Sequence, residues 1–350
     1  MKKVKVLIVD DSALVRKILK DGLSTDPEIE VIGAARDPYQ ARDVLVLKRP
    51  DVITLDVEMP KMDGVSFLRK FMPVYPTPTI MVSSLTERGK KITIEALEAG
   101  AVDIVTKPRT GISDDLPRML EEIRQKVKAA AKVNVSAFAR QRKAAPVRAI
   151  RAPGALDEST DKVIAIGAST GGTEALARIL PAFPRTSPGI VMVQHMPEGF
   201  TRSFAERLDG LCEMKVKEAQ DNDRVLPGLC LLAPGGSRHM RLQRSGGQYR
   251  IRLTEGEKVS GHRPSVDALF TSVALNAGKN SAAALLTGMG KDGAQGLLEI
   301  RRAGGRTVAQ DEESCIVFGM PKAGWENGGA EELVPLHQVP GILLGFISKN

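Results

Sequence analysis

Two groups of residues in this sequence have the types and the spacing that chemistry needs. The first group is acidic: Asp10 and Asp11 end one short apolar run, Asp56 ends another, and Lys107 follows a later one. Carboxylates brought together repel one another unless a cation neutralises them, and oxygen-only ligation suits Mg²⁺. Such a site can also hold a phosphoryl group on one of its own carboxylates, as an aspartyl phosphate.

Each of these acids, taken alone, is compatible with a helix cap or a solvated turn. Coincidence explains the set less well, because an acidic pair, a lone aspartate, the serine pair Ser83 and Ser84, and Lys107-Pro108 all end successive apolar runs. The Lys107–Pro108 bond is a candidate for the cis form, which X–Pro bonds adopt in some tight turns.

The second group centres on Ser169. The stretch GASTG, residues 167–171, fits G-x-S-x-G, with a strand-like run before it and a helix-like run after it. This is the setting of a nucleophile elbow. The N-terminus of the following helix would supply free N–H groups and a positive dipole end, which stabilise an oxyanion as readily as a phosphate. The pattern alone therefore leaves open a catalytic serine or a phosphate cradle.

The residues around this turn favour the catalytic serine. A Walker loop needs Gly-Lys-Ser/Thr, and a dinucleotide fingerprint needs G-x-G-x-x-G with an acid at the end of the next strand. Here position 169 is serine, and the next apolar run ends in Gln194-His195. A lone histidine is more often a satisfied polar residue, but His195 ends a strand beside a candidate nucleophile, where it can serve as a base.

A histidine base needs a carboxylate to orient it, and Asp292 is the candidate. It lies in the glycine-rich turn of LLTGMGKDG, residues 285–293. Its competing role is a cap for the helix predicted after this turn. Because Ser169, His195 and Asp292 would all lie at the carboxyl edge of one sheet, their convergence favours a triad.

The chain order Ser, His, Asp differs from the Ser, Asp, His order of the usual α/β-hydrolases. Other partners for Ser169 therefore stay open: Asp221 or Asp223, with His262 or His337. In the stretch GHRPSVDALF, Ser265 and Asp267 have the positions of a helix cap and a first helical turn. We expect His262 and Arg263 to line a cleft.

These residues need elements that bring them together, and residues 1–124 alternate strand-like with helix-like runs. The strand-like runs are short, rich in β-branched residues and spaced for intervening helices. The pattern predicts a five-stranded parallel sheet with helices on both faces, closed by a helix over 116–131. The strand candidates are VKVLIV, EVIGAA, DVITLD, TIMVSS and DIVTKP.

A second α/β pattern begins at Lys162 and predicts a doubly wound, mostly parallel sheet. The stretch 241–253 contains Ser-Gly-Gly between two polar-apolar runs and predicts an antiparallel hairpin. The strand candidates of this part span 163–167, 189–194, 216–219, 229–234, 249–253, 282–288 and 306–310.

Between the two patterns, residues 125–158 form a basic linker rich in Ala, Pro and Arg, so that a catalytic domain would span 159–350. Nine basic residues and no acidic ones lie between Ile123 and Leu156, whereas the whole chain has a net charge of +8. The positive excess therefore belongs to this segment alone. Aromatic residues make up only 4% of the chain, and no reading module accompanies the charge, which argues against nucleic-acid binding.

The three cysteines are odd in number and lack metal-like spacing, which indicates a reducing compartment. The apolar run near the N-terminus is too short for a signal peptide, and no stretch approaches the length of a membrane span. We therefore expect a cytoplasmic monomer without membrane insertion.

Residues 1–124 resemble a two-component receiver domain through VDDS, LDVEMPKMDG, MVSS and TKP. The resemblance implies a flavodoxin-like fold in which Asp56 accepts the phosphoryl group and Ser83 and Lys107 sense it. The Mg²⁺ ligands that it implies are Asp10 (through water), Asp11, Asp56 and the backbone carbonyl of Glu58.

Residues 162–345 resemble the catalytic domain of the chemotaxis protein-glutamate methylesterases. The matching stretches are IGASTGGTEAL, QHMPEGFTRSFAERL, VLPG, HRPSVDALF, LTGMGKDGAQG and CIVFGMPKA. Carried over by position, Ser169 is the nucleophile, His195 the base and Asp292 its partner. Met289 contributes a backbone oxyanion donor, with Thr170 in support.

The two resemblances together imply a phosphorylation-activated serine esterase without a cofactor of its own. Its substrates would be glutamate methyl esters and glutamines of methyl-accepting chemotaxis receptors, and a chemotaxis histidine kinase would be the phosphodonor. One alternative is a non-catalytic, phosphorylation-dependent module that binds receptors. A DNA-binding response regulator is disfavoured, because residues 160–350 carry no helix-turn-helix signal.

Overall fold

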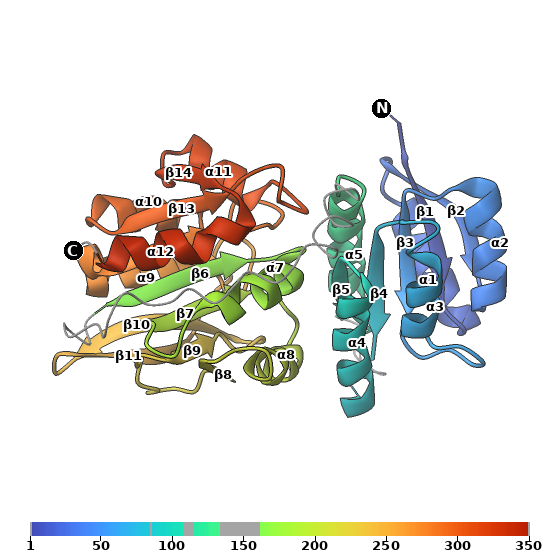
Figure 1. The fold of residues 1–350 in the computed structure, drawn as a ribbon. Coiled ribbons are helices and arrows are strands. Elements are labelled where there is room, and N and C mark those ends of the chain that lie inside the picture. The colour runs from blue at the N-terminus through green and yellow to red at the C-terminus, as the bar shows by residue number, and fades with distance from the viewer. Residues whose placement is uncertain (1, 85, 108–114, 134–161, 349–350) are drawn as a thin grey trace. The chain divides into compact units, whose positions relative to one another are not determined.

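The computed structural model describes residues 2–84, 86–107, 115–133 and 162–348. The chain divides into two compact units, Met1–Val135 and Ser136–Asn350, and each has its own parallel sheet (Figure 1). Residues 134–158 of the expected linker and Pro108, whose preceding bond was a candidate for the cis form, lie outside the described residues.

The N-terminal unit is a five-stranded parallel sheet in the order β2-β1-β3-β4-β5, which confirms the predicted architecture. All five strand candidates form strands. The strands are β1 (Val4–Val9), β2 (Ile29–Ala35), β3 (Val52–Asp56), β4 (Thr79–Ser83) and β5 (Asp103–Thr106). The helices are α1 (Ala13–Ser24), α2 (Pro38–Lys48), α3 (Gly64–Phe71), α4 (Glu87–Ala99) and α5 (Asp115–Ala130).

Alternation of side chains along the strands explains why helices cover both faces of this sheet. Val6 and Ile8 of β1 pack in one core cluster with apolar residues of α1 and α5, such as Leu19 and Ile123. Leu7, between them, faces the side of α2, where a Cβ on Gly33 would meet it. Helix α5 continues to Ala130, so the first residues of the expected linker are helical.

The C-terminal unit is a seven-stranded, all-parallel sheet in the order β14-β13-β12-β6-β7-β9-β8. Its strands are β6 (Val163–Ala168), β7 (Gly189–Gln194), β8 (Lys215–Glu218), β9 (Leu229–Leu232), β12 (Ser281–Leu285), β13 (Arg306–Gln310) and β14 (Glu332–Val334). The three-residue strand β14 was not expected from the sequence. Strand β12 ends at Leu285, three residues before the expected end, because the chain turns into the glycine-rich segment there.

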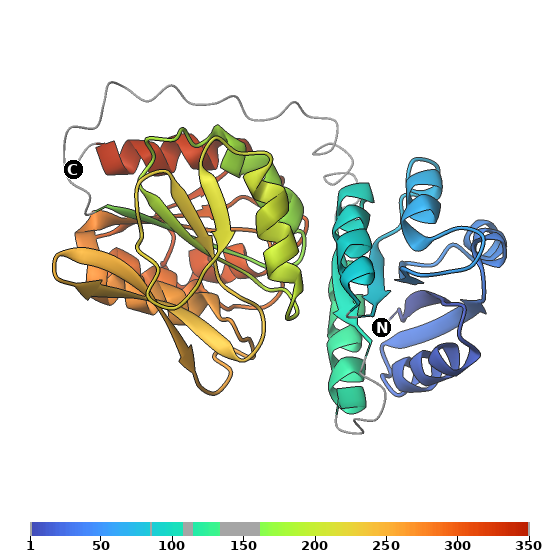
Figure 2. The ribbon, with the colours of Figure 1, turned by 90° about the horizontal axis from the view of Figure 1, so that it is seen from below.

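Helices cover both faces of this sheet as well (Figure 2). They are α7 (Gly172–Ile179), α8 (Phe200–Asp209), α9 (Val266–Ala277), α10 (Ala294–Arg302), α11 (Met320–Glu326) and α12 (Val339–Ser348), with short turns η1 (Leu180–Ala182), η2 (Gly278–Asn280) and η3 (Leu336–Gln338). The core on one face joins α9, α10 and α11 to the sheet through residues such as Val266, Leu297 and Met320.

A separate hairpin packs its inner face on the same core. Strands β10 (Arg238–Ser245) and β11 (Gln248–Glu255) pair antiparallel, as expected. Ser245 pairs with Gln248, so Gly246 and Gly247 form a two-residue turn with φ of 55° and 79°. Positive φ at both positions matches the twist of the strands, and glycine adopts it without steric cost.

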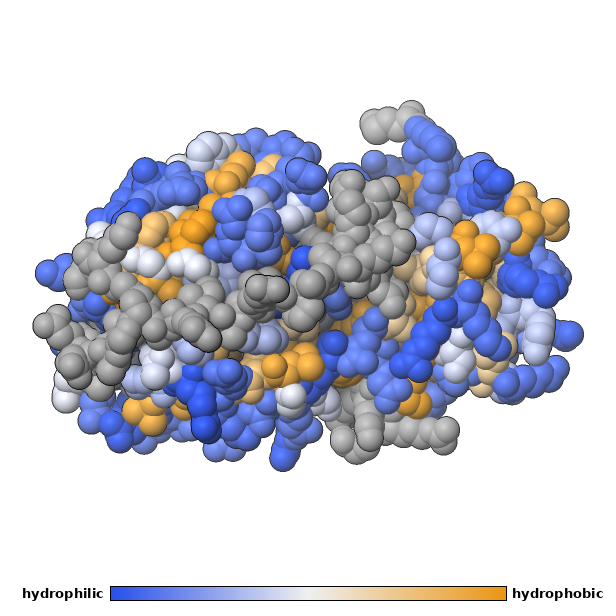
Figure 3. All heavy atoms as spheres, in the orientation of Figure 1, coloured by the Kyte–Doolittle hydropathy of each residue, from blue (hydrophilic) through white to orange (hydrophobic). Residues whose placement is uncertain are grey.

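No helix in the described part of the chain is long and apolar enough to cross a membrane. On the face drawn in Figure 3, hydrophobic residues form small separate patches among hydrophilic ones.

The close approach of α9 and α10 predicts unequal effects of two glycine substitutions. A Cβ at Gly296 would lie 2.5 Å from Cβ of Phe270, whereas one at Gly345 in α12 meets no heavy atom of the described residues within 4 Å. We expect Gly296→Ala to lower the free energy of unfolding of this unit by about 1–3 kcal/mol. Gly345→Ala should leave it unchanged or raise it by up to about 1 kcal/mol.

Urea unfolding followed by tryptophan fluorescence measures this difference, since the only tryptophan of the chain, Trp325, lies in α11 beside α10. An unfolding midpoint of Gly296→Ala equal to that of Gly345→Ala would contradict the prediction.

Candidate functional site

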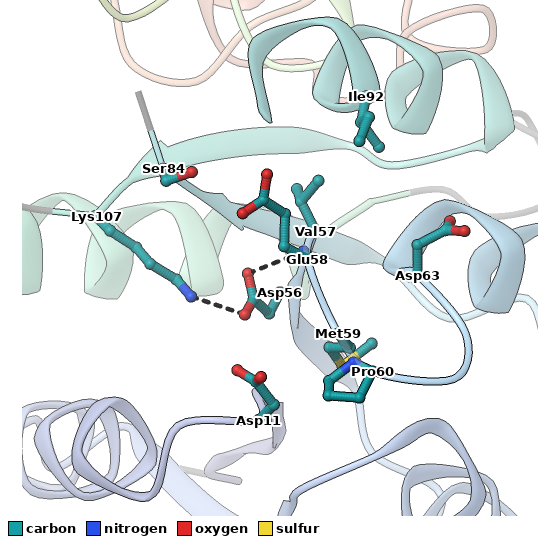
Figure 4. Close-up of a pocket in the computed structure, with 10 residues that line it drawn as sticks. All are labelled: Asp11, Asp56, Val57, Glu58, Met59, Pro60, Asp63, Ser84, Ile92 and Lys107. Carbon is teal, nitrogen blue, oxygen red and sulfur yellow. Dashed lines mark hydrogen bonds and ion pairs between the residues drawn. The ribbon is translucent and has the colours of Figure 1, made fainter. Parts of the chain in front are cut away.

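An acidic pocket opens at the carboxyl edge of the N-terminal sheet. It encloses about 490 Å³. Figure 4 shows its lining, with Asp56 and Lys107 pointing toward one another. The lining residues are Asp11, Asp56, Val57, Glu58, Met59, Pro60, Asp63, Ser84, Ile92 and Lys107. The end of β1, the end of β3 and the segment after β5 therefore converge, as parallel strands require.

The charges in this pocket compensate one another. Nζ of Lys107 lies 2.8 Å from Oδ2 of Asp56 and 2.9 Å from Oδ2 of Asp10. Carboxylate oxygens of Asp10, Asp11 and Asp56 lie within 4.8 Å of one another, so the cluster could hold a metal ion. All its donors are oxygens, which fits a hard divalent cation.

Burial dominates the acidity of Asp56. Loss of solvent raises the pKa most, the charge of Lys107 opposes it and the Asp10 carboxylate adds to it, and the net result is a pKa raised from 3.8 to about 6. Burial would lower the pKa of Lys107, but attraction to Asp56 and Asp10 raises it above its usual value. Lys107 therefore stays charged beside the two carboxyl groups.

Local contacts fix the two loops that carry the carboxylates. Nη1 of Arg16, in α1, donates to the backbone oxygens of Asp10 and Asp11, at 2.8 and 2.9 Å. A Cβ on Gly64 would lie only 2.2 Å from the backbone oxygen of Asp56, so this position requires glycine. The role of Arg16 was missed from sequence, because one arginine in an amphipathic helix gives no signal.

The two serines at the end of β4 differ in their surroundings. The hydroxyl of Ser83 donates to the backbone oxygen of Ser84 at 3.2 Å and contacts the hydroxyl of Thr93, in α4, at 2.7 Å. Ser83 is fully buried, whereas Ser84 lines the pocket. In this state the side chain expected to sense a phosphoryl group is therefore bonded to α4.

Ser169 lies in a tight turn between β6 and α7. Strand β6 ends at Ala168, and Gly171, with φ of 77°, lets the chain enter α7 at Gly172. The N–H of Gly172 donates to the backbone oxygen of Ser169 at 2.7 Å. Strand, serine turn and helix occur in the order that the G-x-S-x-G pattern predicts.

The register of two neighbouring strands places His195 beside this turn. Ala168 of β6 pairs with Gln194 of β7, so Ser169 and His195 are the next residue of each strand. Nε2 of Gln194 donates to the backbone oxygens of both Ser169 and His195, at 2.8 and 3.1 Å. Gln194 was not singled out from sequence, yet its buried amide ties the two strand ends together.

His195 and Asp292 are hydrogen-bonded, with Nε2 of the ring 2.8 Å from Oδ2 of the carboxylate. Since a carboxylate only accepts, Nε2 carries a proton, and in the neutral ring Nδ1 then carries the lone pair. Nδ1 has no hydrogen-bond partner among the described residues, although it is buried. The ring is therefore oriented with a free basic nitrogen.

Asp292 caps a helix, but not the one expected. Helix α10, which follows it, has Gly293 at its N-cap without a side-chain bond. The Asp292 carboxylate instead accepts hydrogen bonds at the N-terminus of α9, from the N–H groups of Val266 and Asp267 and from Oγ of Ser265, at 2.7, 3.0 and 2.7 Å. One carboxylate thus both caps α9 and orients His195.

These donors decide the ionisation of Asp292. Burial alone would raise its pKa, but the hydrogen bond and charge of His195, together with the bonds from Asp267 and Ser265, hold it below its ordinary value. Burial raises the pKa of the neighbouring Asp267. Asp292 is therefore the more acidic carboxyl group of this pair.

The glycine-rich turn after β12 lies against the serine. A Cβ on Gly288 would be 2.8 Å from Cβ of Ser169, so the next residue, Met289, is close to it. The N–H of Met289 donates to no other described residue. Thr170 is buried, and its oxygen accepts a bond of 3.0 Å from Oγ1 of Thr287.

Thr287 was not singled out from sequence, although its hydrogen bonds hold this turn in place. Its carbonyl oxygen accepts from the N–H of Ser169 at 3.0 Å, and its own N–H donates to Oε1 of Gln310 at 2.8 Å. Such hydrogen bonds cannot be predicted from the sequence, because a single polar residue forms no recognisable pattern.

The other candidate acids and histidines make their contacts with residues other than Ser169. Asp221 pairs with Arg252, and Asp223 pairs with Lys217. His337 is exposed in η3. The remaining candidate histidine, His262, stacks its ring on His195, with 3.8 Å between centroids and 9° between planes.

Two family descriptions match the chain. Residues 164–343 match CheB methylesterase, and residues 6–112 match the response regulator receiver domain.

Among curated relatives, a protein-glutamate methylesterase/protein-glutamine glutaminase of Syntrophotalea carbinolica is 56% identical, over 100% of this chain and 99% of its own. A second one, from Pseudomonas aeruginosa, is 53% identical, over 97% of this chain and 96% of its own. Among solved structures, the CheB methylesterase catalytic domain of Thermotoga maritima is 42% identical, with a TM-score of 0.51; the match covers 53% of this chain and 97% of that one.

The raised pKa of Asp56 predicts a pH-dependent instability in metal-free protein. Between its unfolded pKa of 3.8 and its folded pKa of about 6, the folded state binds more protons at this group, so stability falls as the pH rises through this range. We expect Asp56→Asn to be more stable than the wild type at about pH 7 in EDTA, by about 1–3 kcal/mol, and to lose this advantage near pH 4.

Scanning calorimetry of the receiver transition measures the effect, with Asp43→Asn, an exposed acid of the same unit, as the matched control. An Asp56→Asn advantage of equal size at both pH values would contradict the assignment of the shift to this carboxyl group.

Proposed function

The chain belongs to the CheB methylesterase family and carries the receiver domain of a response regulator. On this premise we propose that it hydrolyses glutamate methyl esters on chemotaxis receptors, releasing methanol, and deamidates receptor glutamines, under control of phosphorylation at Asp56. One observation carries the esterase assignment: the carboxylate of Asp292 holds His195 with Nδ1 free, at the strand end next to Ser169.

In the proposed reaction His195 is the general base. Nδ1 takes the proton of Oγ of Ser169, and the oxygen attacks the ester carbonyl carbon. Collapse of the tetrahedral intermediate breaks the bond to the methoxy oxygen, which leaves as methanol with the proton from Nδ1. Water then hydrolyses the acyl-enzyme by the same transfers, so the glutamate carboxylate and Ser169 are restored. With a glutamine substrate the leaving group is ammonia.

Asp292 stabilises the imidazolium that forms during these transfers. Its pKa is below the ordinary value, so it is ionised when His195 gains a proton at Nδ1. The negative oxygen of the intermediate needs N–H donors, and the N–H of Met289 and the N-terminus of α7 are the groups proposed for it, with Thr170 in support. One such donor is typically worth about 3–4 kcal/mol in transition-state stabilisation.

The acidic pocket is the proposed site of control. Asp56 would accept a phosphoryl group from a chemotaxis histidine kinase, and Lys107 and Ser83 would respond to its charge. Asp11, Asp56 and the Glu58 carbonyl would hold Mg²⁺, with Asp10 through water. The ion supplies charge neutralisation for the incoming phosphoryl group. Lys107 already neutralises part of the charge of Asp10 and Asp56.

Substitutions at the serine and the aspartate test the esterase. We expect Ser169→Ala to lower methanol release from methylated receptor by at least about 1,000-fold, and Asp292→Asn by about 1,000- to 10,000-fold with little change in KM. The reason is that the first removes the nucleophile and the second leaves the wrong ring nitrogen protonated.

Asp221→Asn is the matched control, since Asp221 is an exposed candidate partner that pairs with Arg252. A serine-reactive phosphonate should label wild-type protein at Ser169. Full activity of Ser169→Ala, or unlabelled Ser169, would favour a non-catalytic receptor-binding module instead.

Chelation should separate the two sites. The proposed esterase groups are a hydroxyl, an imidazole and a carboxylate already saturated with hydrogen bonds, whereas the acidic cluster is three carboxylates whose oxygens lie within 4.8 Å of one another. We expect EDTA to leave the basal rate of ester hydrolysis unchanged and to abolish its stimulation by acetyl phosphate, with recovery on adding Mg²⁺.

Asp56→Asn should show no stimulation with or without Mg²⁺. Stimulation that persists in EDTA, or in this variant, would mean that the phosphoryl group acts elsewhere.

A further inference from the structure

His239 is a buried histidine to which the proposed mechanism gives no role. It is the second residue of β10 and is 1% exposed. Both ring nitrogens meet backbone groups: Nδ1 lies 3.2 Å from the N of Ser265, and Nε2 lies 2.9 Å from the carbonyl oxygen of Glu257. A histidine whose two nitrogens are both engaged has one fixed orientation.

These two partners also fix its protonation. A backbone N–H can only donate, so Nδ1 must carry a lone pair toward Ser265. A carbonyl oxygen can only accept, so Nε2 must carry the proton toward Glu257. The ring is therefore the neutral Nε2–H form, and an imidazolium would place an N–H of the ring against the N–H of Ser265.

His239 closes a loop. Its two partners, Glu257 and Ser265, stand at the two ends of the segment 257–265, which enters α9. Within this segment the backbones of Val259 and His262 bond to each other at 2.9 and 3.1 Å. His262 carries the ring that stacks on His195. One buried imidazole therefore joins both ends of the segment that covers the candidate base.

The same imidazole is connected to the candidate triad through Ser265. Oγ of Ser265 donates to Oδ1 of Asp292 at 2.7 Å and accepts the N–H of Ala268 at 3.2 Å, as the N-cap of α9. The other oxygen of Asp292 binds His195. A bond from His239 fixes the backbone of Ser265, Ser265 fixes one oxygen of Asp292, and Asp292 orients the base.

We propose that His239 is a positioning residue of the esterase, a neutral imidazole whose Nδ1 fixes Ser265 and thereby aims the Asp292 carboxylate at His195. It touches no reacting atom. The proposal rests on the proposed esterase function and adds a group to it that lies on the hairpin β10–β11, outside the sheet that carries Ser169, His195 and Asp292.

Two isosteric substitutions separate the two bonds of the ring. The amide oxygen of asparagine reaches the place of Nδ1, so His239→Asn keeps the acceptor for Ser265 and loses the donor to Glu257. The amide nitrogen of glutamine reaches the place of Nε2, so His239→Gln keeps that donor and loses the acceptor.

We expect kcat for methanol release to fall about 10- to 100-fold in His239→Gln and less than about 5-fold in His239→Asn, with KM of both within about 3-fold of wild type.

The stability of the two variants separates positioning from structure. Each variant loses one backbone hydrogen bond of a buried ring, so their melting temperatures should fall by similar amounts. His337→Asn and His337→Gln, at an exposed histidine, serve as matched controls. Equal loss of kcat in His239→Asn and His239→Gln, or a greater loss in His239→Asn, would overturn the proposal and leave a structural role only.

A measurement on the unmodified full chain does not depend on whether the variants fold. Nitrogen-15 spectra of the imidazoles at about pH 7 should show His239, like His195, as the neutral Nε2–H form, with the signal assigned to His239 by its loss in the variants or by through-space contact with Ser265. An imidazolium, or the Nδ1–H form, at this position would overturn the proposal. The low-field proton between His195 and Asp292 should shift in His239→Gln and not in His239→Asn.

Ser169→Ala distinguishes failure of the positioning role from failure of the esterase. An inactive Ser169→Ala with equal effects of the two His239 variants removes only the role of His239. A fully active Ser169→Ala removes the esterase assignment and the positioning role together.

Discussion

One buried carboxylate fixes several segments of the C-terminal unit relative to one another. Asp292 is 1% exposed, so its carboxylate has lost its hydration. The free-energy cost of burying this charge is small only if hydrogen-bond donors of the protein replace the lost water. Ser265, Val266, Asp267 and His195 supply them. Because these donors come from the start of α9 and the end of β7, their positions and that of the turn after β12 are fixed by one another. Loss of any one donor leaves part of a buried charge uncompensated.

The two units use the same architecture for different chemistry. In each, a parallel sheet brings side chains from separate strand ends to one edge, where open α/β folds place their sites. The N-terminal sheet brings together carboxylates and a lysine, after β1, β3 and β5. The C-terminal sheet places the candidate hydroxyl, imidazole and carboxylate after β6, β7 and β12, and the last two are hydrogen-bonded. The residues at the edge, and not the fold, therefore decide the chemistry.

Much of this could be predicted from the sequence, for reasons that are local. Buried parallel strands are continuous apolar runs and the hairpin has its Ser-Gly-Gly turn, so thirteen of the fourteen strands match expected runs, and Asp10, Asp56, Ser169 and His195 could be placed at the strand ends. What could not be predicted depends on contacts between distant segments. Gln194, Thr287 and His239 are ordinary polar residues until the fold buries them, and Asp292 caps α9 because of packing, whereas proximity along the chain suggested α10.

The orientation of the His195 ring has a mechanical consequence. Nδ1 is attached directly to the ring carbon that joins the side chain, whereas Nε2 is on the far side of the ring. A rotation about the Cα–Cβ bond therefore moves Nε2 through a longer arc than Nδ1. Asp292 is hydrogen-bonded to the ring at Nε2, the nitrogen farther from this bond. The carboxylate thus restrains the ring at the nitrogen farther from the rotation axis. Nδ1, which would take the serine proton in the proposed reaction, lies closer to this axis, where residual rotation displaces it less.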